Sequence, residues 1–299
     1  MYEIKQSPED FIVNEITDID LKDKGEYSIF LLKKTDYTTE KAIQTIAEKL
    51  NIPRKSIGYA GNKDKKAITT QYISIRWINI KELKLKDLEL TFKGYSDKPI
   101  CLGDLEGNEF IINVYTEQKP KKIEKMINYF GEQRFSKNNK DIGKAIIKKD
   151  FKKAIELVLE HERDYELKCK EHLNHNPTDY IGALRKIPQK ILQMYVHSYQ
   201  SYLWNKMAEH GKNNPQTISI IGFGTKPNPV IDMVLKEEGI TTRDFIIRPI
   251  PELSQEGSER DLFAEIKDLQ IEKIEDRYKL KFKLQKGAYA TEAIKQMFS

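Results

Sequence analysis

The chain has 299 residues, of which 39% are hydrophobic and 32% charged, and its formal net charge is +5. This composition excludes a globally disordered chain, and the longest apolar stretches are too short to cross a membrane. The length suits one large domain or two ordinary ones.

Cysteine usage and the N-terminal residues both favour a cytoplasmic protein. The two cysteines, Cys101 and Cys169, are far apart, which argues against a disulfide framework and a CxxC zinc site. The opening residues "MYEIKQSPEDF" carry acidic residues and a proline where a signal peptide has an apolar core. We therefore expect a cytoplasmic protein.

The first part of the chain mixes strand and helix patterns. Alternating apolar and polar residues predict strands in the segments 1–16, 27–34, 56–60 and 68–77. Residues 38–51, "TTEKAIQTIAEKLN", have the apolar spacing of an amphipathic helix, with Thr38 or Thr39 as its cap.

Helices dominate the middle of the chain, and strands return near its end. Helices are predicted at 120–130, with Pro120 in the first turn, at 141–172 and at 188–210. Strands are predicted at 109–116, 261–274 and 277–290, followed by a helix at 291–298 that Thr291 caps. This order predicts an α+β catalytic body built from both ends of the chain, with a helix-rich insertion between them.

One acidic residue, Asp64, stands among lysines in the loop "GNKDKKA". Neighbouring positive charges keep a carboxylate ionised, and a carboxylate on a rigid loop between strands can act as a nucleophile or general base. From the spacing alone, an exposed turn aspartate in a solvated run of charges explains Asp64 better.

Aromatic and basic residues alternate around the segment "NYFGEQRF" (128–135). Asn128 can hydrogen-bond a base edge and Phe130 can stack, while the lysine-rich segments on both sides suit a phosphate backbone. A helix end with Gly131 as its cap, and a lysine-rich surface that serves solubility, explain the same residues.

Two further groups carry less information. The segment "QKGAYATEA" presents Tyr289 before the last predicted helix, which a capped helix explains equally well. Cys169, His172 and His175 could face a metal from one side of a helix, but a fourth ligand is not obvious, and a surface helix end explains them better.

Taken together, these segments resemble the TruD family of tRNA pseudouridine synthases. The similar segments occur in the family's order and span nearly the whole chain: "KQSPEDFIVNE", "YAGNKDKKAITTQ", "LGDLEGNEF", "NYFGEQRF", "YQSYLWN" and "LQKGAYAT". The resemblance implies a pseudouridine synthase fold with an antiparallel-rich sheet and an inserted helix-rich TRUD domain. We place the catalytic body at 1–139 and 246–299 and the insertion at 140–245.

The resemblance also implies roles for individual residues. Asp64 would be the catalytic nucleophile and Lys5 the lysine beside it. The substrate-binding residues would be Phe11, Asn128, Phe130 and Tyr289.

The implied reaction isomerises uridine to pseudouridine, at position 13 of tRNA, without a cofactor or a metal. The target base must leave its stack, and we expect Phe11 and Tyr289 to sandwich it. tRNA would be the partner of a monomer that needs neither a membrane nor another protein. A non-catalytic RNA-binding protein or chaperone, or a metal-dependent hydrolase, stays the alternative.

Overall fold

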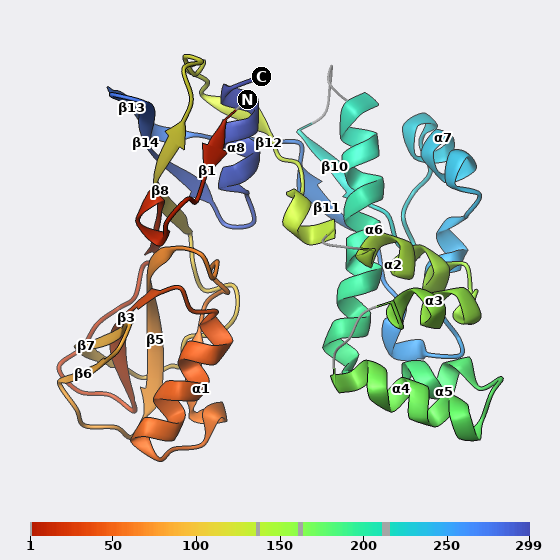
Figure 1. The fold of residues 1–299 in the computed structure, drawn as a ribbon, viewed down its shortest axis with the longest axis horizontal. Helices are drawn as coiled ribbons and strands as arrows, with labels where there is room; N and C mark the ends of the chain where they lie inside the picture. The colour runs from red at the N-terminus through yellow and green to blue at the C-terminus, as the bar shows by residue number, and fades with distance from the viewer. Residues whose placement is uncertain (1, 136–137, 161–163, 211–215) are drawn as a thin grey trace. The chain divides into compact units, whose positions relative to one another are not determined.

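In the computed structural model, which describes residues 2–135, 138–160, 164–210 and 216–299, the chain divides into two units (Figure 1). One consists of Met1–Met126 and Ala264–Ser299, and we call it the sheet unit. The other consists of Ile127–Phe263, and we call it the helical unit. The domain boundaries that the sequence predicts, at 139/140 and 245/246, stay predictions.

A ten-stranded sheet forms the sheet unit, in the order β13-β14-β8-β2-β5-β3-β7-β6, with β1 paired to β8 and β4 to β5. Its strands are β1 (Glu3–Ile4), β2 (Phe11–Ile16), β3 (Tyr27–Thr35), β4 (Ile57–Tyr59), β5 (Ile68–Arg76), β6 (Glu82–Leu85), β7 (Leu88–Ser96), β8 (Gly107–Tyr115), β13 (Lys267–Ile274) and β14 (Arg277–Gln285). Among the described pairs, β2 and β5 are parallel and the others antiparallel. Strands from both ends of the chain therefore meet in one sheet.

Two helices cover this sheet. Helix α1 (Thr39–Leu50) begins where the Thr38 hydroxyl accepts a hydrogen bond from the Lys41 amide at 3.2 Å. Its apolar stripe, including Ile43 and Ile46, packs on β3, β5 and β7. Helix α8 (Ala290–Met297) packs on β2, β8 and β14. Each half of the sheet thus has its own apolar core.

The helical unit is organised around the long helix α6 (Gln189–His210) (Figure 1). Its other elements are α2 (Asn139–Ile147), α3 (Phe151–Val158), α4 (Asp164–His175), α5 (Tyr180–Leu184), α7 (Pro229–Glu238) and the antiparallel pair β10 (Thr217–Ile220) and β11 (Ser258–Asp261). Tyr195, Tyr199 and Leu203 of α6 are buried in the core that α2, α3 and α7 share. The predicted α+β class is confirmed.

The predicted helix at 120–130 is wrong. Part of this segment is the short strand β9 (Lys125–Ile127), which pairs with β12 (Phe263–Glu265). Met126 and Ile127 then join different apolar clusters, because successive side chains of a strand point to opposite faces. Apolar residues at 123, 126 and 127 imitate a helical period, but the distant partner strand decides the conformation.

The predicted cap of the last helix is also wrong. Helix α8 already begins at Ala290, so Thr291 lies inside its first turn. Tyr289 occupies the N-cap position, and its carbonyl accepts from the amides of Glu292 and Ala293.

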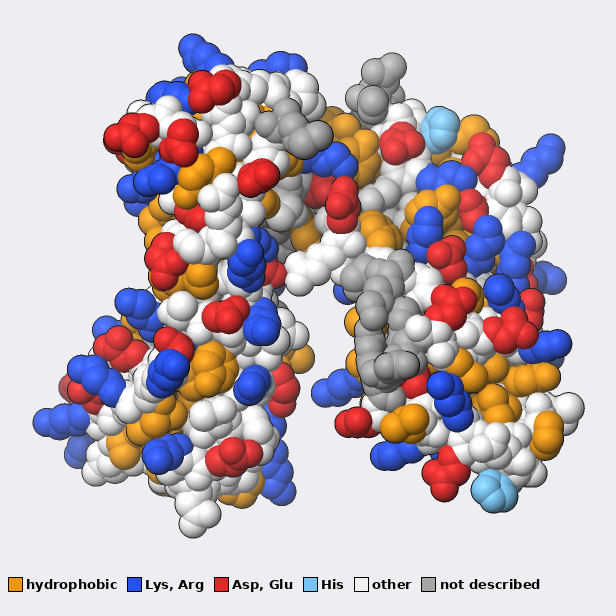
Figure 2. Space-filling model, in the orientation of Figure 1, with side chains coloured by type: hydrophobic (Ala, Val, Ile, Leu, Met, Phe, Trp, Pro, Cys, Tyr) orange, Lys and Arg blue, Asp and Glu red, His pale blue; other side chains and the backbone are white. Residues whose placement is uncertain are grey.

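Within the described ranges, no helix combines the length and apolar composition that a membrane crossing requires. On the face drawn in Figure 2, Lys and Arg side chains are interspersed with Asp and Glu over both units.

Candidate active site

Asp64 and Lys5 form an ion pair in the sheet unit. Lys5 Nζ lies 2.6 Å from Asp64 Oδ2, and the two side chains are 21% and 25% exposed. Lys5 follows β1 and has a φ of 59°, in the left-handed region that a lysine seldom adopts. This backbone conformation directs the Lys5 side chain toward the loop that carries Asp64.

The turn after Lys5 is anchored to β8 through Asp10. The Asp10 carboxylate accepts from Asn113 and Tyr115 at 3.0 Å each and from the Ser7 amide at 2.9 Å. Burial would raise the pKa of Asp10, but these hydrogen bonds outweigh it and lower the pKa below its usual value. An ionised Asp10 thus fixes the segment that connects Lys5 to Phe11.

Phe11 lies directly beneath the lysine. Lys5 Nζ stands 4.0 Å from the centroid of the Phe11 ring, and Phe110 contacts the same ring edge-on at 6.2 Å. Phe11 is only 2% exposed. In this arrangement one face of the ring supports the Lys5 ammonium, and a base can reach that face only if Lys5 moves aside.

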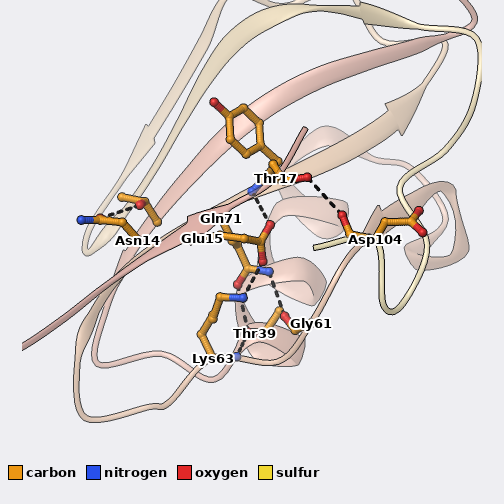
Figure 3. A network of polar contacts seen from close by, with 10 residues as sticks. Asn14, Glu15, Thr17, Thr39, Gly61, Lys63, Gln71 and Asp104 are labelled. Atoms are coloured by element: carbon orange, nitrogen blue, oxygen red, sulfur yellow. Dashed lines mark hydrogen bonds and ion pairs between the residues drawn. The ribbon is translucent and has the colours of Figure 1, made fainter. Parts of the chain in front are cut away.

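Buried side chains from two elements, α1 and β5, hold the backbone of the Asp64 loop (Figure 3). Gln71 of β5 donates to the Gly61 carbonyl at 3.0 Å, and the Thr39 hydroxyl of α1 accepts from the Lys63 amide at 2.9 Å. Thr39 in turn donates to Gln71 at 3.1 Å. Backbone groups fixed in this way place the nucleophile candidate before any substrate binds.

A buried ion pair fixes the side chain next to Asp64. Lys63 Nζ lies 2.5 Å from Glu15 Oε2, and Glu15 Oε1 also accepts from the Tyr72 amide at 3.2 Å (Figure 3). Both side chains are nearly inaccessible to solvent, so the pair is costly to break. Glu15 thus binds the ammonium of Lys63, while Lys5 contacts the carboxylate of Asp64.

A third side chain, Lys34, also holds the backbone of the Asp64 loop. This lysine of β3 is fully buried, and its Nζ donates to the carbonyls of Tyr37 at 2.6 Å and Asp64 at 2.9 Å. Burial lowers the pKa of Lys34 to about 8, while the charge of Asp64 opposes this shift and that of Lys63 adds to it.

Asn128 and Phe130 lie together in the helical unit, where Arg260 of β11 contacts both. Arg260 donates to the Asn128 Oδ1 at 2.7 Å and to its carbonyl at 3.0 Å. Its guanidinium lies 4.1 Å from the centroid of the Phe130 ring, and Trp204 contacts that ring edge-on at 5.6 Å. Asn205 bonds both the amide and the carbonyl of Phe130 at 2.9 Å.

The Asn128 side chain is engaged within the protein. It is buried, and its amide group donates to the Asp261 carbonyl at 3.2 Å in addition to accepting from Arg260. The half-buried Phe130 ring and the Arg260 guanidinium stacked on it are therefore the more accessible members of this cluster.

The structure thus brings Lys5, Phe11 and Asp64 together in the sheet unit. Tyr289 belongs to the same unit and is half-buried; its neighbours Ala288 and Ala290 pack in the apolar cluster that contains Phe11.

The possible metal ligands of α4 are otherwise engaged. Cys169 is buried and donates to the Ala183 carbonyl at 3.2 Å, and His172 bonds Asp179 at 2.8 Å. Across the part of the chain that is described, no three His, Cys, Asp or Glu side chains are grouped so that they could hold a metal ion.

Lys34 and Arg260 are the two candidate site residues that the sequence reasoning missed. Lys34 continues the buried face of β3 after Phe30 and Leu32, so a lysine at an inward position was a usable signal. No local pattern marks Arg260, because its partner Asn128 is 132 positions away.

Comparison with known proteins gives a consistent picture. The family model described as tRNA pseudouridine synthase D (TruD) matches residues 2–168, 159–218 and 217–297. A tRNA pseudouridine synthase D from Aquifex aeolicus is 32% identical, over 99% of this chain and 97% of its own length. The crystal structure of a Methanosarcina mazei protein assigned as tRNA pseudouridine synthase D superposes with a TM-score of 0.75 at 28% identity, covering 99% of this chain and 93% of that chain. The family resemblance predicted from the sequence is confirmed.

Proposed function

This chain belongs to the TruD family of tRNA pseudouridine synthases, and we propose from that premise that it isomerises uridine 13 of tRNA with Asp64 as its nucleophile. Pseudouridine synthases are isomerases. The bond between N1 of uracil and C1′ of ribose breaks, C5 bonds to C1′ instead, and the hydrogen of C5 leaves to solvent while N1 gains a proton. The rearrangement is redox-neutral and needs no co-substrate, so the proposal includes no cofactor and no metal.

The observation that carries the proposal is the ion pair between Lys5 and Asp64, 2.6 Å long and only partly exposed. The Lys5 ammonium at this distance orients the Asp64 carboxylate, and a carboxylate held in a fixed position can serve as a nucleophile. The hydrogen bonds to the loop backbone support the same role, because they limit how far Asp64 can move.

The proposed substrate contacts fall into two groups. In the sheet unit, Tyr289 stacks on the extruded uracil, and Phe11 supports Lys5 and meets the base only after Lys5 shifts. In the helical unit, Phe130 stacks on RNA beside the Arg260 guanidinium, and Asn128, which is buried, hydrogen-bonds RNA only after its amide leaves the Asp261 carbonyl.

The proposal extends to the setting of the reaction. tRNA is the partner, and the lysine-rich segments around 119–153 contact its phosphates. We further propose a cytoplasmic monomer that needs no second protein.

The test uses tRNA transcripts labelled with tritium at C5 of uridine. We expect Asp64→Asn to retain tRNA affinity within about threefold and to lower tritium release by at least about a thousandfold, because the amide cannot act as the nucleophile. Lys5→Met should lower turnover by about tenfold or more while changing affinity little.

Near-normal tritium release by Asp64→Asn would remove Asp64 from its role. An inactive wild-type protein that still binds tRNA would favour the non-catalytic RNA-binding alternative. Pseudouridine mapping of the product settles the position, since a modified uridine other than number 13 contradicts that part of the proposal.

A further inference from the structure

Lys34 is a positively charged residue at a buried position of β3, where an apolar side chain is usual. It continues the inward face of β3 after Phe30 and Leu32, and it is 0% exposed. Removing an ammonium from water is expensive, and an apolar side chain of similar volume often serves stability equally well or better. A buried lysine here therefore calls for an explanation other than packing.

The hydrogen bonds of Lys34 in the described structure go to backbone carbonyls and not to a carboxylate. One carbonyl belongs to Tyr37, in the turn before α1, and the other to Asp64 itself. The ammonium thus ties the end of β3 to the residue that carries the proposed nucleophile.

Of the lysines Lys5, Lys34 and Lys63, the first two bond to Asp64 and the third bonds to Glu15. Lys5 contacts the carboxylate, and Lys34 contacts the backbone of the same residue from the protein interior. Lys63, the nearest lysine in sequence, is held by Glu15. Lys34 is consequently a fixed positive charge on the buried side of Asp64, where water screens it least.

We propose that Lys34 is a positioning residue for the nucleophile: its buried ammonium fixes the backbone of Asp64 and places a positive charge on the interior side of that residue. This inference rests on the proposed function, because it presupposes that Asp64 reacts. It assigns to β3 a part in catalysis that neither the loop nor Lys5 supplies.

The proposal has a consequence for the pH dependence of the rate. The charged groups that influence Lys34 are Asp64 and Lys63, which are themselves bound to Lys5 and Glu15. Because the pKa of Lys34 is lowered to about 8, its charge is present at neutral pH and is lost as the pH rises through that value. The rate of the chemical step should fall on the same alkaline limb.

The experiment compares Lys34→Met with Lys33→Met. Lys33 is the exposed neighbour on the same strand, so its replacement controls for the loss of one lysine near the loop. For each protein we would measure the thermal midpoint, the dissociation constant for a tRNA transcript, and the single-turnover rate of tritium release between pH 6.5 and 9.0.

We expect Lys34→Met to bind tRNA within about threefold of the wild type, to react about 10- to 100-fold more slowly at pH 7, and to lose the alkaline limb near pH 8. Lys33→Met should keep both the rate and the limb. Lys34→Gln, which keeps hydrogen-bond donors without a charge, should react at an intermediate rate and also lack the limb.

A wild-type rate and an unchanged limb in Lys34→Met would overturn the inference. So would an equal loss of affinity, thermal midpoint and rate, because that pattern describes a purely structural lysine. If both Lys34 variants fail to fold, a wild-type rate that is independent of pH between 7 and 9 overturns it. Failure of the proposed function is separate, since it shows as wild-type inactivity or as an active Asp64→Asn.

Discussion

At the scale of single residues, Glu238 illustrates how the helical unit handles a buried charge. This last residue of α7 accepts hydrogen bonds from Lys144 at 2.7 Å, Lys206 at 2.8 Å and Tyr199 at 3.2 Å. Burial would raise the pKa of Glu238, but the hydrogen bonds from the two lysines outweigh it and lower the pKa to about 2. One carboxylate thereby joins α2, α6 and α7.

This shift predicts an acid-sensitive helical unit. Because the folded pKa is depressed, Glu238 contributes stability above its ordinary pKa near 4.5, and the contribution is lost as the pH falls toward about 2. Glu238→Gln should lower the unfolding free energy at pH 7 by about 3 kcal/mol and flatten its dependence on pH between 5 and 2. Urea unfolding at several pH values measures both effects.

Glu237→Gln is the matched control for this measurement. Glu237 is more exposed than Glu238, and it forms an ion pair with Lys206 at 2.9 Å. Its replacement should cost less than about 1 kcal/mol, in keeping with surface pairs. Equal effects of the two substitutions would contradict the role assigned to Glu238.

At the scale of elements, the crossing of α2 and α6 depends on a residue without a side chain. A Cβ atom added to Gly143 would fall against the Tyr195 carbonyl oxygen, well inside van der Waals contact, and close to the Tyr199 side chain. The two helix backbones can approach this closely only because position 143 is glycine.

Gly143→Ala therefore tests the packing against intrinsic helix preference. In an isolated helix this change would add about 1 kcal/mol of stability, whereas here we expect it to lower the thermal midpoint by several degrees, because a backbone carbonyl cannot yield as a side chain can. A raised midpoint would contradict the close crossing. Tritium release is then measured at a temperature where the variant is folded. An unchanged rate shows that the substitution disturbs the packing of the helical unit and not the site around Asp64.

The elements that the sequence predicted well are those whose signals are local. The cap and apolar stripe of α1, and the length of α6, can be read from adjacent residues. Strand β9 could not be read in this way, because its partner β12 lies far along the chain. In the same way, Lys5 and Asp64 are 59 positions apart, and only the resemblance to a family placed them together in advance.

At the scale of the whole molecule, the net charge of +5 is small for a protein that acts on a polyanion. Local lysines must therefore supply most of the attraction to tRNA. Exposed lysines occur on and beside helices α2 and α3, at positions 148, 152 and 153.

Replacing Lys152 and Lys153 together by glutamine should weaken tRNA binding several-fold at low salt and reduce the slope of log K against log salt concentration by about 1 to 2. The single-turnover rate at saturating tRNA should not change. Lys81 and Lys86, exposed beside β6, provide a double-glutamine control. Equal slopes for the wild type and the α3 variant would show that this helix does not contact phosphates.

The pairing of β8 with β14 has a consequence for synthesis on the ribosome. All nine residues of β8 pair with β14, which is translated only after residues 127–263. While residues 127–263 emerge and fold, a nascent chain keeps one border of β8 open, and open strand borders invite association with other polypeptides. Residues 127–263 can therefore fold before the sheet unit is complete, because β14 follows them in the chain.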